Sequence, residues 1–200
     1  DEMVVNIGIR YDYFDPASVY PSNRRNPSNQ LTYKDTSGVL IDSLMSTYPD
    51  AEIIDQISPR IGFAYQLGNE AVLHFSYGHF FQMPPLYAMY QNHSFLIPPN
   101  DHGTTMGNVR LEPEKTITYE IGLWQELTRG LSLDVALFYR DIYNLLSAQV
   151  FSTYNQIEYG LYSNKDYGNA RGLEVKLDMG FGALKGMLNY TLQYTRGNAD

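Results

Sequence analysis

The sequence predicts an all-β fold, an antiparallel up-and-down β-barrel that crosses a membrane. Seven short segments alternate apolar and polar residues, and on one face of these segments 32 of 34 side chains are apolar. Because successive side chains of a strand point to opposite sides, each segment should have one apolar and one polar face. The connections alternate between long and short, which is typical of barrels in outer membranes.

The first expected strand, 5–13, carries Val, Ile and Tyr at every second position. It leads into a long connection over about 14–58, which is rich in Pro, Asn, Ser and Asp, residues that favour turns and irregular backbone. The second and third strands, 60–67 and 71–82, repeat the alternation. The short reversal between them, 68–70, predicts a tight hairpin.

A second long connection, 83–115, contains two Pro-Pro pairs and leads to the fourth strand, 116–123. A short reversal that contains Gly130 separates this strand from the fifth, 131–140, where Leu, Val and Tyr fill the apolar positions. Glycine at such a reversal adopts positive φ at little cost. These segments therefore extend the pattern of a tight turn on one side and a long connection on the other.

The third long connection, 141–171, precedes the sixth strand, 172–179, and a glycine turn then leads to the seventh, 184–195. In an up-and-down barrel every second connection lies on the same side of the membrane. Aromatic residues gather at the strand ends next to the long connections, and amphipathic rings prefer the membrane–water interface. The long connections are therefore expected at the cell surface.

Composition limits the other classes of protein. The 200 residues carry a net charge of −8 and no cysteine, which argues against nucleic-acid binding, disulfides and thiol chemistry. No run of 18 apolar residues exists, so a transmembrane helix is excluded. The chain opens almost directly into a strand and ends just after one. We therefore expect an interior piece of a longer polypeptide, with seven strands of a larger barrel.

A soluble antiparallel sandwich is the alternative fold, because it also gives each strand one apolar face. Three features favour the membrane barrel. The segments approach the length that a tilted strand needs to span a bilayer. Small residues are interspersed with the charges on the polar face. The lengths of the connections alternate without exception.

Several stretches resemble the barrels of TonB-dependent outer-membrane receptors. Residues 111–122, with Leu-Glu-Pro-Glu-Lys-Thr and then Tyr-Glu-Ile-Gly, resemble the family's entry into a barrel strand from an extracellular loop. Residues 77–85 resemble a strand end of that family, and 138–144 with 169–175 resemble a later pattern. Residues 58–63 are similar to a strand opening in members with large surface loops. The stretches at 77–85, 111–122, 138–144 and 169–175 also follow the family's order.

The resemblance implies a barrel of about 22 strands with a plug domain of the same chain inside it. It also implies residence in the bacterial outer membrane and uptake of a scarce nutrient, such as a metal chelate, glycan or peptide, driven through the TonB complex. The sequence itself contains neither a plug domain nor a TonB box. A surface structural or adhesion barrel, or a passive porin, therefore stays open as an alternative function.

The ligand contacts are expected in the long connections, because aromatic side chains offer a large contact area at low entropic cost. The candidates are Tyr48, Tyr87, Tyr90 and Phe95, together with His93 and His102. Packing of the connections on one another is the alternative reason for these aromatic residues. The histidine spacing matches no standard metal motif, so neither a metal site nor a cofactor is expected.

The polar face carries charges of both signs. No nucleophile or oxyanion-hole pattern accompanies them, so no catalytic residues and no enzyme activity are expected. A mixed set of charges suits a wall that lines water or a plug. The residues are Arg10, Asp12, Arg60, Glu120, Asp134, Arg140, Glu174, Lys176 and Asp178.

Overall fold

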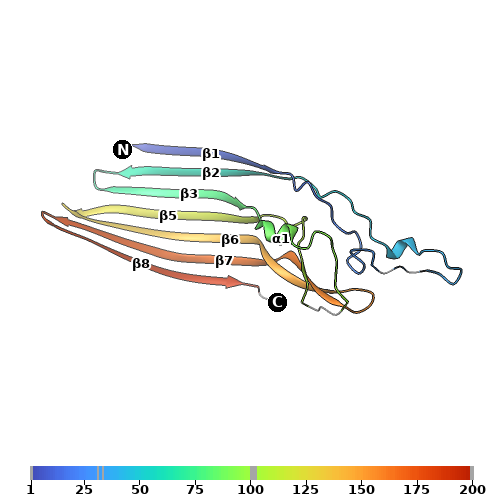
Figure 1. Ribbon diagram of the computed structural model, residues 1–200. Coiled ribbons are helices and arrows are strands. Elements are labelled where there is room, and N and C mark those ends of the chain that lie inside the picture. Colours follow the sequence, from blue (N-terminus) through green and yellow to red (C-terminus); the bar gives the residue numbers. More distant parts are fainter. Residues whose placement is uncertain (1, 31, 33, 100–102, 199–200) are drawn as a thin grey trace.

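A computed structural model describes residues 2–30, 32, 34–99 and 103–198, which form one curved β-sheet with irregular connections at one end (Figure 1). The long strands are β1 (Met3–Phe14), β2 (Ile54–Leu67), β3 (Ala71–Gln82), β5 (Glu114–Thr128), β6 (Leu131–Ser152), β7 (Glu158–Phe181) and β8 (Leu184–Gly197). Each pairs antiparallel with its neighbour in the chain, as predicted. A short strand, β4 (Thr105–Met106), pairs parallel with the outer part of β7.

The connections divide by length between the two ends of the sheet. The turns β2–β3, β5–β6 and β7–β8 are short and lie together at one end, and the long connections lie at the other (Figure 1). In the described residues of the long connections, the helical elements are one turn, η1 (Asp42–Leu44), and one short helix, α1 (Leu86–Tyr90). No helix in the described residues has the length and apolar character to cross a membrane.

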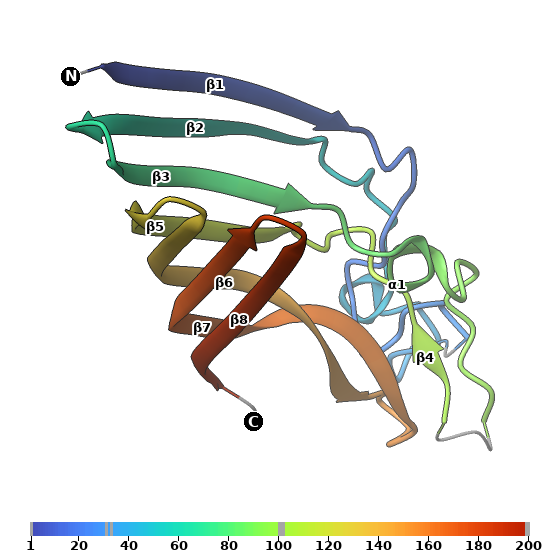
Figure 2. The ribbon, with the colours of Figure 1, turned by 90° about the vertical axis from the view of Figure 1, so that its left-hand side faces the viewer.

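The apolar face of the sheet has no second protein layer over it in the described part of the chain (Figures 1 and 2). Ile7 is 70% exposed on β1, and Leu188 is 61% exposed on β8. A sandwich would bury such residues between its two sheets. A single layer with a bare apolar face is instead the wall of a barrel that faces hydrocarbon.

The polar face is concave. Figure 2 shows that the sheet curls from β1 towards β8. A hollow of about 630 Å³ lies on this face, and residues of β1, β2, β3, β5 and β6 line it, among them Gly8, Arg60, Glu120 and Arg140. The polar side chains therefore point into the interior of the curved wall, as the alternation predicts.

Glycine allows close packing on this inner face. Gly172 of β7 stands opposite Phe138 of β6. A methyl group added at Gly172 would lie 2.3 Å from the carbonyl oxygen of Leu192 and 2.7 Å from the Phe138 ring. The ring thus lies over the bare glycine backbone, an arrangement that compensates for the missing side chain of a strand glycine.

The third connection differs from the prediction. Residues 141–171 were expected as a loop, whereas β6 continues to Ser152 and β7 begins at Glu158, so most of this segment is a hairpin that projects beyond the sheet. The register of β6 and β7 is irregular between Ile142 and Leu146, and Asn144 adopts a positive φ of 60°. This irregularity shifts the alternation and hides the continuing strand from a period-two pattern.

Candidate functional site

Three segments assemble at the long-connection end of the sheet, and we call their assembly the cap. They are the first connection (15–53), the second connection (83–113) and the projecting hairpin (143–167). Two apolar clusters lie inside the part of the cap that the structure describes. One buries Ile97, Met106, Tyr159 and Leu161, and the other buries Ala88, Met89 and Leu111. Because each cluster includes or contacts residues from more than one segment, the cap has a shared core.

The first connection is fastened to the hairpin by two neighbouring arginines. The hydroxyl of Tyr159 donates to the carbonyl oxygen of Arg24 at 2.6 Å, and the Arg24 guanidinium lies 5.0 Å from the centre of the Phe151 ring. The backbone N–H of Tyr154 donates to the carbonyl oxygen of Arg25 at 3.0 Å, and the Arg25 guanidinium lies 4.6 Å from the Tyr154 ring centre. Cation–π contacts thus reinforce hydrogen bonds to the backbone carbonyl oxygens of the two arginines.

The second connection is fastened to the hairpin by asparagine side chains. The Asn164 amide donates to the Glu112 carbonyl oxygen at 2.8 Å, and its oxygen accepts the Glu112 backbone N–H at 2.7 Å. The Asn108 amide donates to the carbonyl oxygen of Tyr162 at 2.9 Å. An amide can satisfy a backbone donor and acceptor at once, so Asn164 replaces a missing strand partner for Glu112.

The first and second connections also contact each other directly. The rings of Tyr48 and Phe95 are stacked, with centroids 5.7 Å apart. The hydroxyl of Tyr90 donates to the carbonyl oxygen of Pro16 at 3.0 Å. All three pairs of segments are therefore joined, and the cap is one interlocked unit rather than three free loops.

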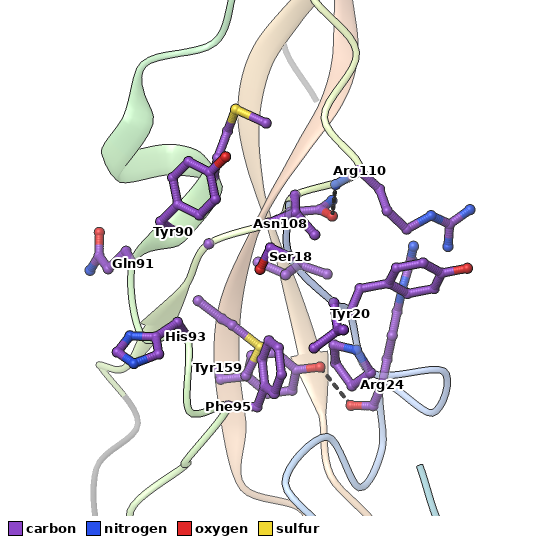
Figure 3. A pocket seen from close by; sticks show the side chains of 17 residues that line it. Ser18, Tyr20, Arg24, Tyr90, Gln91, His93, Phe95, Asn108, Arg110 and Tyr159 are labelled. Atoms are coloured by element: carbon purple, nitrogen blue, oxygen red, sulfur yellow. Dashed lines mark hydrogen bonds between the residues drawn. The ribbon is translucent and has the colours of Figure 1, made fainter. Parts of the chain in front are cut away.

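A crevice lies where the three segments meet (Figure 3). Its enclosed part measures about 30 Å³, room for about one water molecule. Aromatic rings and three basic side chains line it, and no acidic side chain among the described residues does. The lining residues that carry these groups are Tyr20, Arg24, Tyr90, His93, Phe95, Arg110 and Tyr159.

The predicted ligand contacts fall into two groups. Tyr90, His93 and Phe95 all line the crevice, and Tyr48 reaches the same region through its stack on Phe95. Tyr87 does not line the crevice: its ring meets the Tyr162 ring edge-on, with centroids 5.8 Å apart, and the residue is 58% exposed. His102 lies outside the described residues.

Sequence reasoning missed four of these seven crevice residues, namely Tyr20, Arg24, Arg110 and Tyr159. Arg110 lies over the Tyr20 ring, with its guanidinium carbon 4.6 Å from the ring centre. Single arginines in polar connections give no pattern by which they could be recognised. Tyr159 lies in the third long connection, and nothing in the sequence there distinguished it from the other tyrosines of the chain.

Two tyrosines of the cap, Tyr159 and Tyr90, are held in their neutral form. Burial raises the pKa of Tyr159 to about 12, with the positive charge of Arg24 acting in the opposite direction. Burial also raises the pKa of Tyr90, and the negative charge of Asp15 adds to the effect. A neutral hydroxyl can donate a hydrogen bond. These two therefore serve as donors to the backbone of the first connection.

Among the residues described, the site holds no cluster of metal ligands. No group of three or more His, Cys, Asp or Glu side chains there could hold a metal ion. On the inner face, Arg60 and Arg140 lie over the rings of Phe80 and Phe138, at 4.6 and 4.8 Å. These charges rest on neighbouring aromatic residues, as expected of a lining.

A curved sheet with a bare apolar outer face, short turns at one end and a large interlocked cap at the other defines an outer-membrane barrel. The family model "TonB dependent receptor-like, beta-barrel" matches residues 1–200, so the chain belongs to this family. Its location is the bacterial outer membrane, and its family is one of receptors and transporters. The resemblance seen in the sequence is thereby confirmed.

Solved structures of this class share the fold. The FrpB iron transporter of Neisseria meningitidis (F3-3 variant) matches with a TM-score of 0.61 and 16% identity, over 98% of this chain and 24% of that one. The hemophore receptor HasR of Serratia marcescens, solved as a double mutant with HasA and heme, matches with a TM-score of 0.59 and 18% identity, over 96% of this chain and 30% of that one. The siderophore receptor PirA of Pseudomonas aeruginosa matches with a TM-score of 0.57 and 20% identity, over 75% of this chain and 30% of that one.

The chain spans between about a quarter and a third of the length of these three structures. At such identities the likeness concerns the fold. No curated protein matches the sequence.

Proposed function

We propose that this chain is part of the barrel of an outer-membrane receptor that takes up a scarce nutrient by TonB-coupled active transport. The cap would face the outside of the cell and capture the ligand. The plug domain of the same polypeptide would occupy the concave polar face. The observation that supports this proposal most directly is the interlocked cap, with aromatic and basic side chains around a crevice that three segments share.

An iron-bearing ligand is the first class to test. The fold neighbours include an iron transporter, a siderophore receptor and a hemophore receptor with heme, and each of those names describes that protein. Among the residues described, three basic side chains and no acidic one line the crevice. Its enclosed part holds about one water molecule, so an anionic ligand such as an iron chelate or haem would rest on the basic rim rather than inside it. Glycans and peptides are the remaining classes.

The test uses the full-length receptor in a strain that lacks its own copy. Uptake of radiolabelled ferric siderophores and of haem, and growth on glycans or peptides, would be compared with and without TonB. Uptake that requires TonB is expected. Uptake that persists without TonB would indicate a passive porin, and no uptake of any probe would favour a structural or adhesion barrel.

Point variants then ask whether the cap captures the ligand. Removing the basic side chain by His93→Ala is expected to lower ligand retention at the cell surface, because His93 is exposed and lines the crevice. Val39→Ala is the matched control, since Val39 is a cap residue that is 61% exposed and does not line the crevice. Equal retention by both variants would remove the crevice from the proposal.

A further inference from the structure

A row of cross-strand neighbours crosses the apolar face near the cap. The registers place Tyr77 beside Tyr119, Tyr119 beside Tyr139, and Arg171 between Tyr139 and Tyr194. The first three rings contact one another, with centroids 5.1 and 6.3 Å apart. Directly opposed residues of neighbouring strands point to the same face. Arg171 is thus a cation set within a line of tyrosines on the face that meets lipid.

The height of this row on the barrel corresponds to a membrane interface. Arg171 stands ten residues before Phe181, the last residue of β7, and Tyr194 stands ten residues after Leu184, the first of β8. A tilted strand of about 9–11 residues spans the hydrocarbon core. With the cap outside the cell, as proposed above, the row lies at the level of the outer-leaflet headgroups.

A second arginine accompanies the first. Arg196 follows Tyr194 by two residues on the same face of β8, diagonal to Arg171, and such diagonal neighbours lie roughly 7 Å apart. Neither arginine forms an ion pair within the part of the chain that the structure describes. The nearby carboxylate of Asp141 instead accepts hydrogen bonds from Tyr167 and Asn169. Two guanidinium groups are therefore left to face the membrane surface.

We propose that Arg171 and Arg196 bind the phosphate of an outer-leaflet lipid headgroup. A guanidinium presents paired N–H donors that match phosphate oxygens. A charge on the lipid-facing side is costly at the centre of the bilayer and nearly free at its surface, to which a long side chain can reach. The flanking rings of Tyr139 and Tyr194 would cover the region between headgroup and acyl chains.

The surroundings point to a lipid rather than a soluble ligand. Directly below the arginines, on the side of the short turns, the same face continues into the cross-strand pair Leu173 and Leu192. Leu192 is 42% exposed, so an apolar surface lies beneath the cationic one. Closing the barrel or filling it with a plug covers the inner face and leaves this outer face bare. An amphiphile with a phosphate head and acyl tails fits both parts.

The experiment measures lipid binding by the full-length receptor in a zwitterionic detergent. The probe is fluorescent phosphatidylglycerol, and diacylglycerol with the same acyl chains is the phosphate-free comparison. The double variant Arg171→Gln with Arg196→Gln is expected to bind phosphatidylglycerol on the order of thirtyfold more weakly, because it loses two basic groups that would attract the anionic headgroup. Its binding of diacylglycerol should not change. Lys185→Gln, on β8 near the short turns, is the matched control and should bind like the wild type.

Three results would overturn the proposal. The first is equal affinity of the double glutamine variant and the wild type for phosphatidylglycerol. The second is displacement of the lipid by millimolar inorganic phosphate, which would show a site for the free anion. The third is unchanged affinity in the double lysine variant, Arg171→Lys with Arg196→Lys. This variant keeps both charges and serves if the glutamine variant does not assemble. Because lysine lacks the paired N–H donors of arginine, its affinity for phosphatidylglycerol should fall several-fold. Transport plays no part in these measurements, so they stand apart from the uptake tests.

Discussion

The ring of Tyr48 lies parallel to the ring of Phe95, with centroids 5.7 Å and planes 13° apart. The hydroxyl of Tyr48 also donates to the carbonyl oxygen of Pro27 at 2.9 Å. One side chain therefore holds two parts of the first connection together and joins them to the second. A residue expected from the sequence to contact a ligand thus also has a structural role.

Replacing Tyr48 by alanine is expected to loosen the cap without weakening the barrel. The change removes a stacked pair that contributes about 0.5–1.5 kcal/mol beyond its area, and a hydrogen bond worth about 1 kcal/mol. Hydrogen exchange of the full-length receptor should therefore rise around Phe95 and Pro27. Tyr48→Phe keeps the ring and loses only the hydroxyl, so in this variant hydrogen exchange should rise near Pro27 but not around Phe95. If both variants exchange alike around Phe95, the stack does not contribute.

A methyl group at position 107 should push this part of the second connection away from the end of α1. The Cβ atom of Gly107→Ala would lie 2.6 Å from both the backbone nitrogen of Gln91 and the carbonyl oxygen of Met89. Overpacking of this kind costs about 1–3 kcal/mol. Limited proteolysis is expected to cut the cap of this variant faster. Gly197→Ala is the control, because its nearest neighbour would be an ordinary contact at 3.7 Å; equal cleavage of both would contradict the prediction.

Gly172→Ala is expected to impair the barrel itself. The added methyl group would meet the carbonyl oxygen of Leu192 at 2.3 Å, and this oxygen belongs to the backbone of the next strand and cannot rotate away. Gly8→Ala, also on the inner face, meets only the Arg60 side chain at 3.9 Å. The fraction of heat-modifiable, folded barrel on a gel should fall for Gly172→Ala alone. A normal folded fraction would show that β7 and β8 can move apart.

The cap should loosen at high pH through Tyr159. Its pKa in the folded state, about 12, lies above the ordinary value of 10, so folding favours the neutral hydroxyl. The resulting stabilisation is complete below pH 10 and is lost as the pH rises from 10 to 12. Protection of residues 158–161 from hydrogen exchange should fall over this window. Tyr159→Phe has no such proton to lose, and an identical pH profile in that variant would contradict the assignment.

The strands were predictable because each obeys a local rule. Side chains such as Ile61, Leu133 and Leu177 alternate with polar ones, and hydrocarbon on one side with a wet interior on the other imposes that alternation along the entire strand. The projecting hairpin does not face lipid. Beyond Asp141 the adjacent apolar pair Leu145 and Leu146 and the irregular register break the period, so the sequence no longer reads as a strand there.

The candidate site was predictable in part. Aromatic residues in polar connections stand out in a sequence, and Tyr90 and Phe95 do line the crevice. The residues that complete it come from distant parts of the chain. Arg24 and Tyr159 are 135 positions apart, and their contact depends on how the connections fold over one another. No local sequence pattern predicts a contact between residues so far apart in the chain.

The interlocking of the cap limits how the exposed surface of this protein can diversify. A substitution in one segment alters its contacts with the two segments that pack on it. Residues such as Arg24, Asn164 and Met89 are therefore constrained by partners far away in the chain. Change in a single segment would then require compensating changes in the others. Grafting one connection from a relative should fail where grafting all three together succeeds.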